Sequence, residues 1–141
     1  MYEDILGGRE PDETLWRVPF SVRSASDAEP ASTLMEKREA TTRLTPASHG
    51  STDEWIKVNP LQTGFYRVKY APEELAKLTS PIRNLVLPAS DRLGIQNDAF
   101  ALAKAGHIPA TEFLAIAEAY VNETDASVCA DLATNMGGID V

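Results

Sequence analysis

The fold is decided by residues 55–70, which read WIKVNPLQTGFYRVKY. Trp55–Asn59 is a short apolar run that ends at Pro60, and Phe65–Tyr70 alternates apolar with basic side chains. This two-residue period is typical of a half-buried strand. Gly64 lies in the short connection between the two runs and can adopt a positive φ in a tight turn. The sequence therefore predicts two strands joined as a β-hairpin.

The same alternation occurs upstream of this hairpin. From Leu15 onward, Trp16, Val18, Phe20 and Val22 alternate with polar residues or proline, which predicts another strand. Because Pro19 has no N–H for a strand ladder, this strand is expected at a sheet edge, or with the Pro19 nitrogen turned outward. A weaker extended segment covers roughly residues 33–44. Residues 15–70 are therefore predicted to form a small β-sandwich of short strands, preceded by a flexible lead-in at residues 1–14.

A helical period replaces the strand period after Ala71. Pro72 suits the first position of a short helix through Leu78, and Ser80-Pro81 indicates a further short turn of helix. Three longer helices are expected to begin at Ser90 or its neighbour Asp91, at Thr111, and at Thr124 or Asp125. Gly106 lies just past the expected end of the first of these helices. Ser90 is the predicted N-cap, and Asp91 is placed in the first turn, where it favours the helix dipole. The short loops predict antiparallel neighbours for residues 71–141, so the expected class is α+β with a truncated α-solenoid.

The charge distribution excludes several classes of protein. The net charge is -8, and residues 88–141 hold eight acids but only Arg92 and Lys104. Such a surface repels phosphate backbones, so no nucleic-acid partner is expected.

The apolar runs are too short for a membrane span, and the acidic start does not resemble a signal peptide. A single cysteine, Cys129, suits a reducing compartment, so a cytoplasmic location is expected.

No constellation for catalysis is visible in the residues. A zinc hydrolase needs three ligands and a base, but the two histidines, His49 and His107, have no second His or Cys at ligand spacing. No Gly-x-Ser-x-Gly elbow occurs. Cys129 lacks a visible activating base and is expected to be a small buried hydrophobe. We therefore predict no catalytic residue and no metal ligand in this chain.

Three stretches together resemble the puromycin-sensitive-type zinc aminopeptidases, a family of gluzincin aminopeptidases. They are Trp16–Phe20 (WRVPF), residues 55–70, and Asp91–Gly106 (DRLGIQNDAFALAKAG). Asn122–Thr124 and Asp131-Leu132 continue the likeness, which covers roughly residues 15–136.

The resemblance implies a position within a larger enzyme. In this family a small β-sandwich follows a thermolysin-like catalytic domain, and a helical solenoid then closes over the active site. The resemblance places residues 15–70 in the sandwich and residues 71–141 at the start of the solenoid. The zinc motif H-E-x-x-H and the G-x-M-E-N motif of the family lie upstream and do not occur here, so zinc is implied only for the intact enzyme. The start at Met1, without catalytic-domain sequence, suggests a truncated gene product or an excised segment.

The polar residues of the helix that begins near Ser90 have two interpretations, and both stay open. Asp91 and Arg92 can act locally, as a cap and as the partner of a nearby acid. Alternatively, as the resemblance implies, this helix packs against the absent catalytic domain through interdomain contacts of its polar side chains: Arg92, Gln96, Asn97 and Asp98. The aromatic residues Trp16, Trp55, Phe65 and Tyr66 are likewise expected in the core, with a binding patch as the alternative.

The sequence thus predicts a non-catalytic fragment of a zinc metalloaminopeptidase, which in its intact form removes N-terminal residues from peptides. The fragment would be a spacer or scaffold between the catalytic and helical lid domains, and these absent domains would be its partners. The alternatives are an independent β-sandwich module that recruits another protein and, last, an autonomous hydrolase. The apolar stripes of residues 91–136 also predict an exposed hydrophobic patch and self-association.

Overall fold

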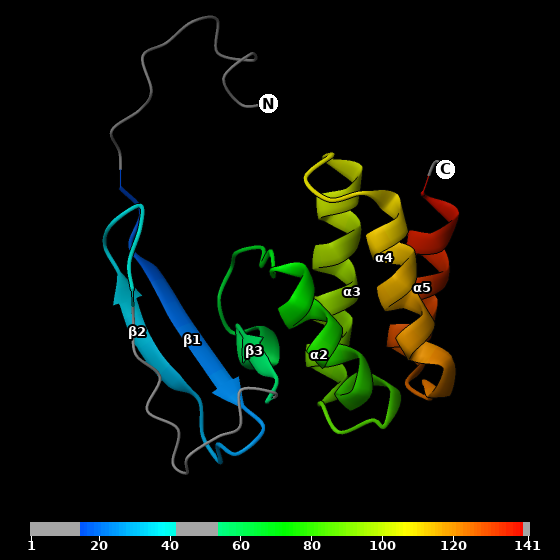
Figure 1. The fold of residues 1–141 in the computed structure, drawn as a ribbon, viewed down its shortest axis with the longest axis horizontal. Coiled ribbons are helices and arrows are strands. Elements are labelled where there is room, and N and C mark those ends of the chain that lie inside the picture. The colour runs from blue at the N-terminus through cyan, green and yellow to red at the C-terminus, as the bar shows by residue number, and fades with distance from the viewer. Residues whose placement is uncertain (1–14, 42–53, 140–141) are drawn as a thin grey trace, which may run out of the picture.

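The computed structural model describes residues 15–41 and 54–139. Within these ranges a small sheet lies beside a group of helices, and the chain passes from the first to the second only once (Figure 1). The α+β class is therefore confirmed. The elements, in chain order, are β1 (Val18–Ser24), β2 (Ala31–Met35), β3 (Ile56–Val58), η1 (Pro60–Gln62), α2 (Pro72–Arg83), α3 (Ala89–Lys104), α4 (Ala110–Ala117), η2 (Glu118–Asn122) and α5 (Ala126–Gly137).

The sheet has the strand order β2-β1-β3, and both pairs are antiparallel. β1 confirms the strand predicted from Leu15 onward. β2 begins at Ala31 and ends at Met35, so the extended segment predicted for residues 33–44 is confirmed only at residues 33–35, and the described residues 36–41 form no strand. The edge position predicted for β1 is wrong, since β1 is the central strand. Pro19 is nevertheless tolerated, because β3 pairs only with Val22–Ser24 and leaves the Pro19 end of β1 paired with β2 alone.

The predicted hairpin of residues 55–70 is wrong. β3 pairs with β1, and residues 65–70 form no strand. The chain turns away directly after β3, because Asn59, Leu61 and Gln62 all have positive φ, at 54°, 59° and 56°. This left-handed conformation costs energy for residues with a Cβ, so contacts elsewhere must hold it in place. The expected role of Gly64 in the turn is thus taken by non-glycine residues.

The described strands form one three-stranded sheet, so the second layer of the predicted sandwich stays a prediction. The same holds for the continuing solenoid and for the domain boundary near residue 70. The predicted lead-in and His49 lie outside the described residues.

Two helix predictions need correction. α2 runs without a break to Arg83 and contains Pro81 near its end, so the two short helices expected here are one. α3 begins at Ala89, and its N-cap is Pro88, so Ser90 is not the cap. The carbonyl of Pro88 already accepts the N–H groups of Asp91 and Arg92, which starts the helix earlier than predicted.

The helix ends predicted at Gly106 and Asp125 are confirmed, whereas α4 begins at Ala110, one residue before the predicted Thr111, with Pro109 as its N-cap. Gly106 follows α3 with a φ of 75°, and the N–H of His107 donates to the carbonyl of Leu102, as in a glycine-terminated helix. At α5 the side chain of Asp125 accepts the N–H groups of Ser127 and Val128, which is a regular N-cap.

The apolar core lies among the helices. Phe113 is fully buried and meets the ring of Phe100 edge-on, with the centroids 5.8 Å apart. Val22 is the only apolar strand residue that is buried in the described part of the sheet. Trp16 and Phe65 are exposed, so the core position predicted for these two aromatic residues is wrong. The sheet therefore contributes little to the core and presents apolar surface to solvent.

The helices in the described part of the chain are too short or too polar to cross a bilayer.

The stability of the fold should depend on α2. We expect Ile82→Val to lower the free energy of unfolding by about 1 kcal/mol, because Ile82 is fully buried and the change leaves a small cavity. Urea denaturation would measure the effect, with Val86→Ala at an exposed position as the control. Equal effects of the two changes would contradict the placement of the core.

Candidate functional site

The candidate residues predicted from the sequence lie on helix α3, which is in the middle of the molecule (Figure 1). It contacts η1, α4 and α5. Most polar side chains of this helix are consequently buried: Asp91, Arg92, Gln96 and Asp98 are each at most 6% exposed. A buried polar group is costly unless it is hydrogen-bonded, so the partners of these residues determine what α3 does.

Asp91 connects α3 to the segment that follows β3. Its Oδ1 accepts the N–H of Leu61 at 2.5 Å and lies 4.0 Å from the Nζ of Lys57. Lys57 is itself 1% exposed and donates to the carbonyls of Val58 and Asn59. Burial lowers the pKa of Lys57, and the charge of Asp91 opposes this shift. Asp91 is in the first turn as predicted, but its carboxylate holds the strained turn at Leu61 and does not cap its own helix.

Asp98 repeats this contact two helical turns further along α3. Its Oδ2 accepts the N–H of Val68 at 3.1 Å, and its Oδ1 pairs with Arg67 at 3.0 Å. Residues seven apart lie on one face of a helix, so Asp91 and Asp98 face the same segment. The two carboxylates therefore fix residues 61–68 along α3.

Arg92 connects α3 to η2 and to the start of α5. Its Nε and Nη2 donate to the two oxygens of Glu123 at 2.6 and 2.7 Å, and its Nη1 donates to the carbonyl of Leu87. Glu123 also accepts the N–H groups of Thr124 and Asp125. The hydrogen bonds from Arg92 are the main reason that the pKa of Glu123 falls to about 2. A bidentate arginine–carboxylate pair of this kind is stronger and more specific in its geometry than a hydrogen bond between neutral groups.

Further contacts of α3 reach α5 and η2. Gln96 donates to the carbonyl of Val128, and Asn97 bonds to Asp131 and Asn135. The hydroxyl of Tyr120 donates to the carbonyl of Arg92 at 2.6 Å, and burial raises the pKa of Tyr120.

All four candidate interdomain residues thus have partners within this chain. Arg92 pairs with an acid of the chain itself, as the local interpretation predicted. Asn97 is the one member of the set that is partly exposed. The contact of these residues with another domain stays a prediction.

Sequence reasoning missed several residues of the network. Lys57, Tyr70 and Glu123 received no role, although all three lie in stretches that carry the family resemblance. Tyr70 accepts the N–H of Val58 at 2.9 Å and so holds β3 from the side. Cys129 was expected to be buried, but it is exposed, because it is the neighbour of Val128 on α5 and Val128 takes the inward position.

The described residues do not fit a metal site. His107 is exposed, and residues 15–41 and 54–139 contain no group of three His, Cys, Asp or Glu side chains that could hold a metal ion. Zinc needs at least three such ligands. The zinc that the resemblance implies for the intact family therefore has no donor set in this part of the chain.

The Arg92–Glu123 pair makes a prediction about stability. We expect Glu123→Gln to cost about 3 kcal/mol at neutral pH, because it removes the charge that compensates a buried arginine. Since the pKa of Glu123 is lowered on folding from 4.5 to about 2, the contribution of its charge is complete above pH 4.5. It is lost as the pH falls toward 2, so the difference between the two proteins should shrink over this range.

Urea unfolding at several pH values would measure this difference. The control is Glu118→Gln, which removes an exposed charge from the adjoining 3-10 helix and should have little effect at any pH. A cost for Glu123→Gln that stays constant between pH 5 and about pH 2 would contradict the role of the ion pair.

Comparison with known proteins places these features in a family. Residues 55–141 match the family described as "ERAP1-like C-terminal domain". The puromycin-sensitive aminopeptidase of Caenorhabditis elegans is 34% identical over 122 residues, which are 84% of this chain and 12% of that protein. Aminopeptidase M1-B of Oryza sativa is 36% identical over 132 residues, 89% of this chain and 15% of the relative. Aminopeptidase M1 of Arabidopsis thaliana is 32% identical over 138 residues, 91% and 16%.

The chain thus spans less than a fifth of the length of each of these relatives. The resemblance inferred from the sequence is confirmed, and it covers the residues that form the α3 network. The chain belongs to the M1 aminopeptidase family and corresponds to its ERAP1-like C-terminal region.

Proposed function

We propose that this chain is a structural, non-catalytic portion of a zinc aminopeptidase, in which it joins the catalytic domain to the helical domain. The observation that carries the proposal is the network of α3. Asp91 and Asp98 hold residues 61–68, and Arg92, Gln96 and Asn97 hold η2 and α5. A helix bonded on opposite sides in this way transmits the position of one unit to the other.

The chemistry of the intact enzyme would come from elsewhere. Zinc-assisted hydrolysis of the N-terminal peptide bond needs metal ligands and a base, and the described residues contain no such group. We place the metal, the peptide and the catalytic residues on the upstream domain. The single cysteine is compatible with a cytoplasmic location.

The exposed apolar residues indicate where the upstream domain would dock. Trp16 is 80% exposed and Leu34 50%, both on the sheet side of the molecule, while Phe65 is fully exposed on the loop that α3 holds. Large exposed apolar side chains of this kind can anchor a contact with another domain. We therefore assign the interdomain contact to this sheet-side surface of Trp16, Leu34 and Phe65, in addition to the partly exposed Asn97. A second sheet layer, as expected for the predicted sandwich, would cover the same residues.

The chain alone should have no aminopeptidase activity. Purified protein is expected to contain no stoichiometric zinc by elemental analysis and to release no product from aminoacyl-anilides. Either zinc at one equivalent or cleavage above the buffer rate would contradict the proposal.

The coding sequence upstream of this segment at its source locus gives a second test. We expect an in-frame H-E-x-x-H motif there, and the segment that carries it, expressed separately, should bind this chain. Phe65→Ser should weaken that binding by at least about tenfold in calorimetry, because an exposed aromatic anchor is lost. Val86→Ser, also at an exposed apolar position but in the loop before α3, is the control. Equal binding by both variants would contradict the docking surface assigned to the sheet side.

A further inference from the structure

A groove between α2 and α4 has no role in the network described above. Its volume is about 140 Å³. It is lined by residues of the two helices, most of them apolar: Pro72, Leu75, Ala76, Thr79, Glu112, Ala115 and Ile116. An apolar cavity of roughly 150 Å³ is large enough to take up benzene, so this groove can hold one ring or one branched alkyl group.

Glu112 is the one charged residue in the lining of this groove. It is partly buried in the first turn of α4, and its carboxylate has no hydrogen bond or ion pair with any described residue. The positive end of α4 makes a carboxylate favourable at this place without a cationic partner. The carboxylate of Glu112 therefore has no partner among the described residues and lies next to apolar surface.

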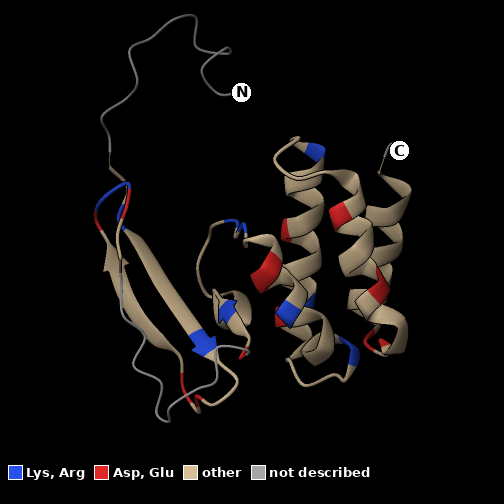
Figure 2. Cartoon of the chain, in the orientation of Figure 1, with Lys and Arg blue, Asp and Glu red and all other residues tan. Residues whose placement is uncertain are grey.

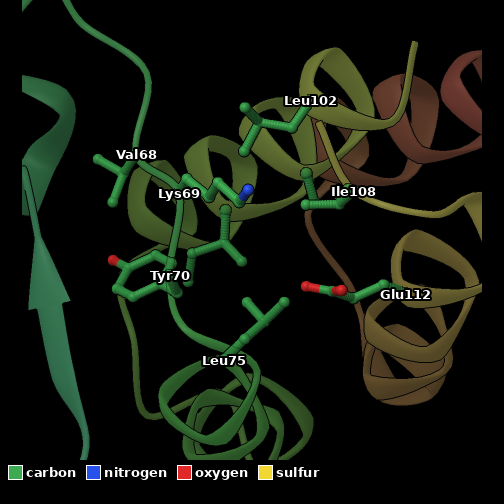
Figure 3. A pocket seen from close by; sticks show the side chains of 9 residues that line it. Val68, Lys69, Tyr70, Leu75, Leu102, Ile108 and Glu112 are labelled. Atoms are coloured by element: carbon green, nitrogen blue, oxygen red, sulfur yellow. The ribbon is translucent and has the colours of Figure 1, made fainter. Parts of the chain in front are cut away.

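A smaller cavity adjoins the groove, and the two share Leu75 and Glu112. The volume of this cavity is about 10 Å³, which is enough for a single water molecule. Figure 3 shows the carboxylate of Glu112 directed toward Leu75, with the ammonium group of Lys69 on the other side of the cavity. Lys69 likewise has no ion-pair partner among the described residues. Lys69 and Glu112 thus border one apolar space without pairing.

We propose that the groove binds a primary ammonium group attached to one apolar ring or branched alkyl group. The apolar group would occupy the space over Leu75, Ala76 and Ile116, and the ammonium would donate to Glu112. A cation is favoured over an anion, because Glu112 is the one charged residue of the lining and α4 contains no basic residue (Figure 2), while Lys77 of the opposite helix pairs with Glu74. Such a group occurs in free organic amines and at the amino terminus of peptides.

The probe for this site is 2-phenylethylamine, which carries a ring and a primary ammonium. Titration of the full chain, followed by amide NMR shifts, should map binding to α2 and α4 with millimolar affinity, the range of such small ligands. The neutral analogue 2-phenylethanol should bind at least about threefold more weakly, since it lacks the charge-assisted hydrogen bond. The anion 3-phenylpropionate should not bind.

Matched variants locate the interaction. In Glu112→Gln, the amine should bind no more tightly than the alcohol. Glu118→Gln should leave the preference for the amine unchanged, since Glu118 is exposed and does not line the groove. Ala115→Phe should fill the groove and abolish binding of both ligands. Lys69→Gln should strengthen binding of the amine slightly, because it removes a like charge near Glu112.

Three results would overturn the proposal: equal affinity for amine and alcohol, shifts that map away from α2 and α4, or an unchanged preference in Glu112→Gln. Retained helical circular dichroism in each variant distinguishes loss of the site from loss of the fold. Phenylalanine amide carries the same ring and ammonium on a peptide-like carbonyl. Tighter binding of this compound than of 2-phenylethylamine assigns the site to peptide amino termini, and weaker binding assigns it to free amines.

Discussion

The structure depends on two buried carboxylates, Asp91 and Asp98, that lie two turns apart on one face of α3. A buried charge must find hydrogen-bond donors, and α3 can offer its own side chains none on this face. The donors come from the irregular segment after β3, through the backbone N–H groups of Leu61 and Val68. This requirement explains why the backbone tolerates positive φ at Leu61 and why residues 65–70 follow α3 and do not return to the sheet.

The opposite side of α3 is fixed by the same principle with the charges reversed. Arg92 is buried, and Glu123 supplies both of its oxygens to it while also accepting the first N–H groups before α5. Gln96 and Asn97 add neutral contacts to α5. The helix thus has polar contacts both to the segment after β3 and to η2 and α5, which is consistent with a position between two units and with the joining role proposed for this region of an aminopeptidase.

Local rules predicted the parts of the fold that depend on neighbouring residues. The helices followed from their period, and Gly106 and Asp125 from the requirements of helix ends, because these signals act within about one turn. The hairpin prediction failed because the partners of Leu61 and Val68 lie 30 residues away, on α3. Arg92, Gln96, Asn97 and Asp98 were identified as unusual from their place on an apolar helix, but Glu123 and Lys57 could not be identified as their neighbours without the fold. The prediction that Cys129 is buried was wrong by one position, because its neighbour Val128 takes the inward position on α5.

Amide hydrogen exchange tests directly whether the carboxylates of α3 hold the segment after β3. The N–H groups of Leu61 and Val68 belong to no regular strand or α-helix, so only their bonds to Asp91 and Asp98 protect them. We expect slow exchange at both amides. In Asp98→Ala, the amide of Val68 should lose its protection selectively, while the amide of Leu61 should stay protected. Rapid exchange of both amides in the unmodified chain would contradict this role of the carboxylates.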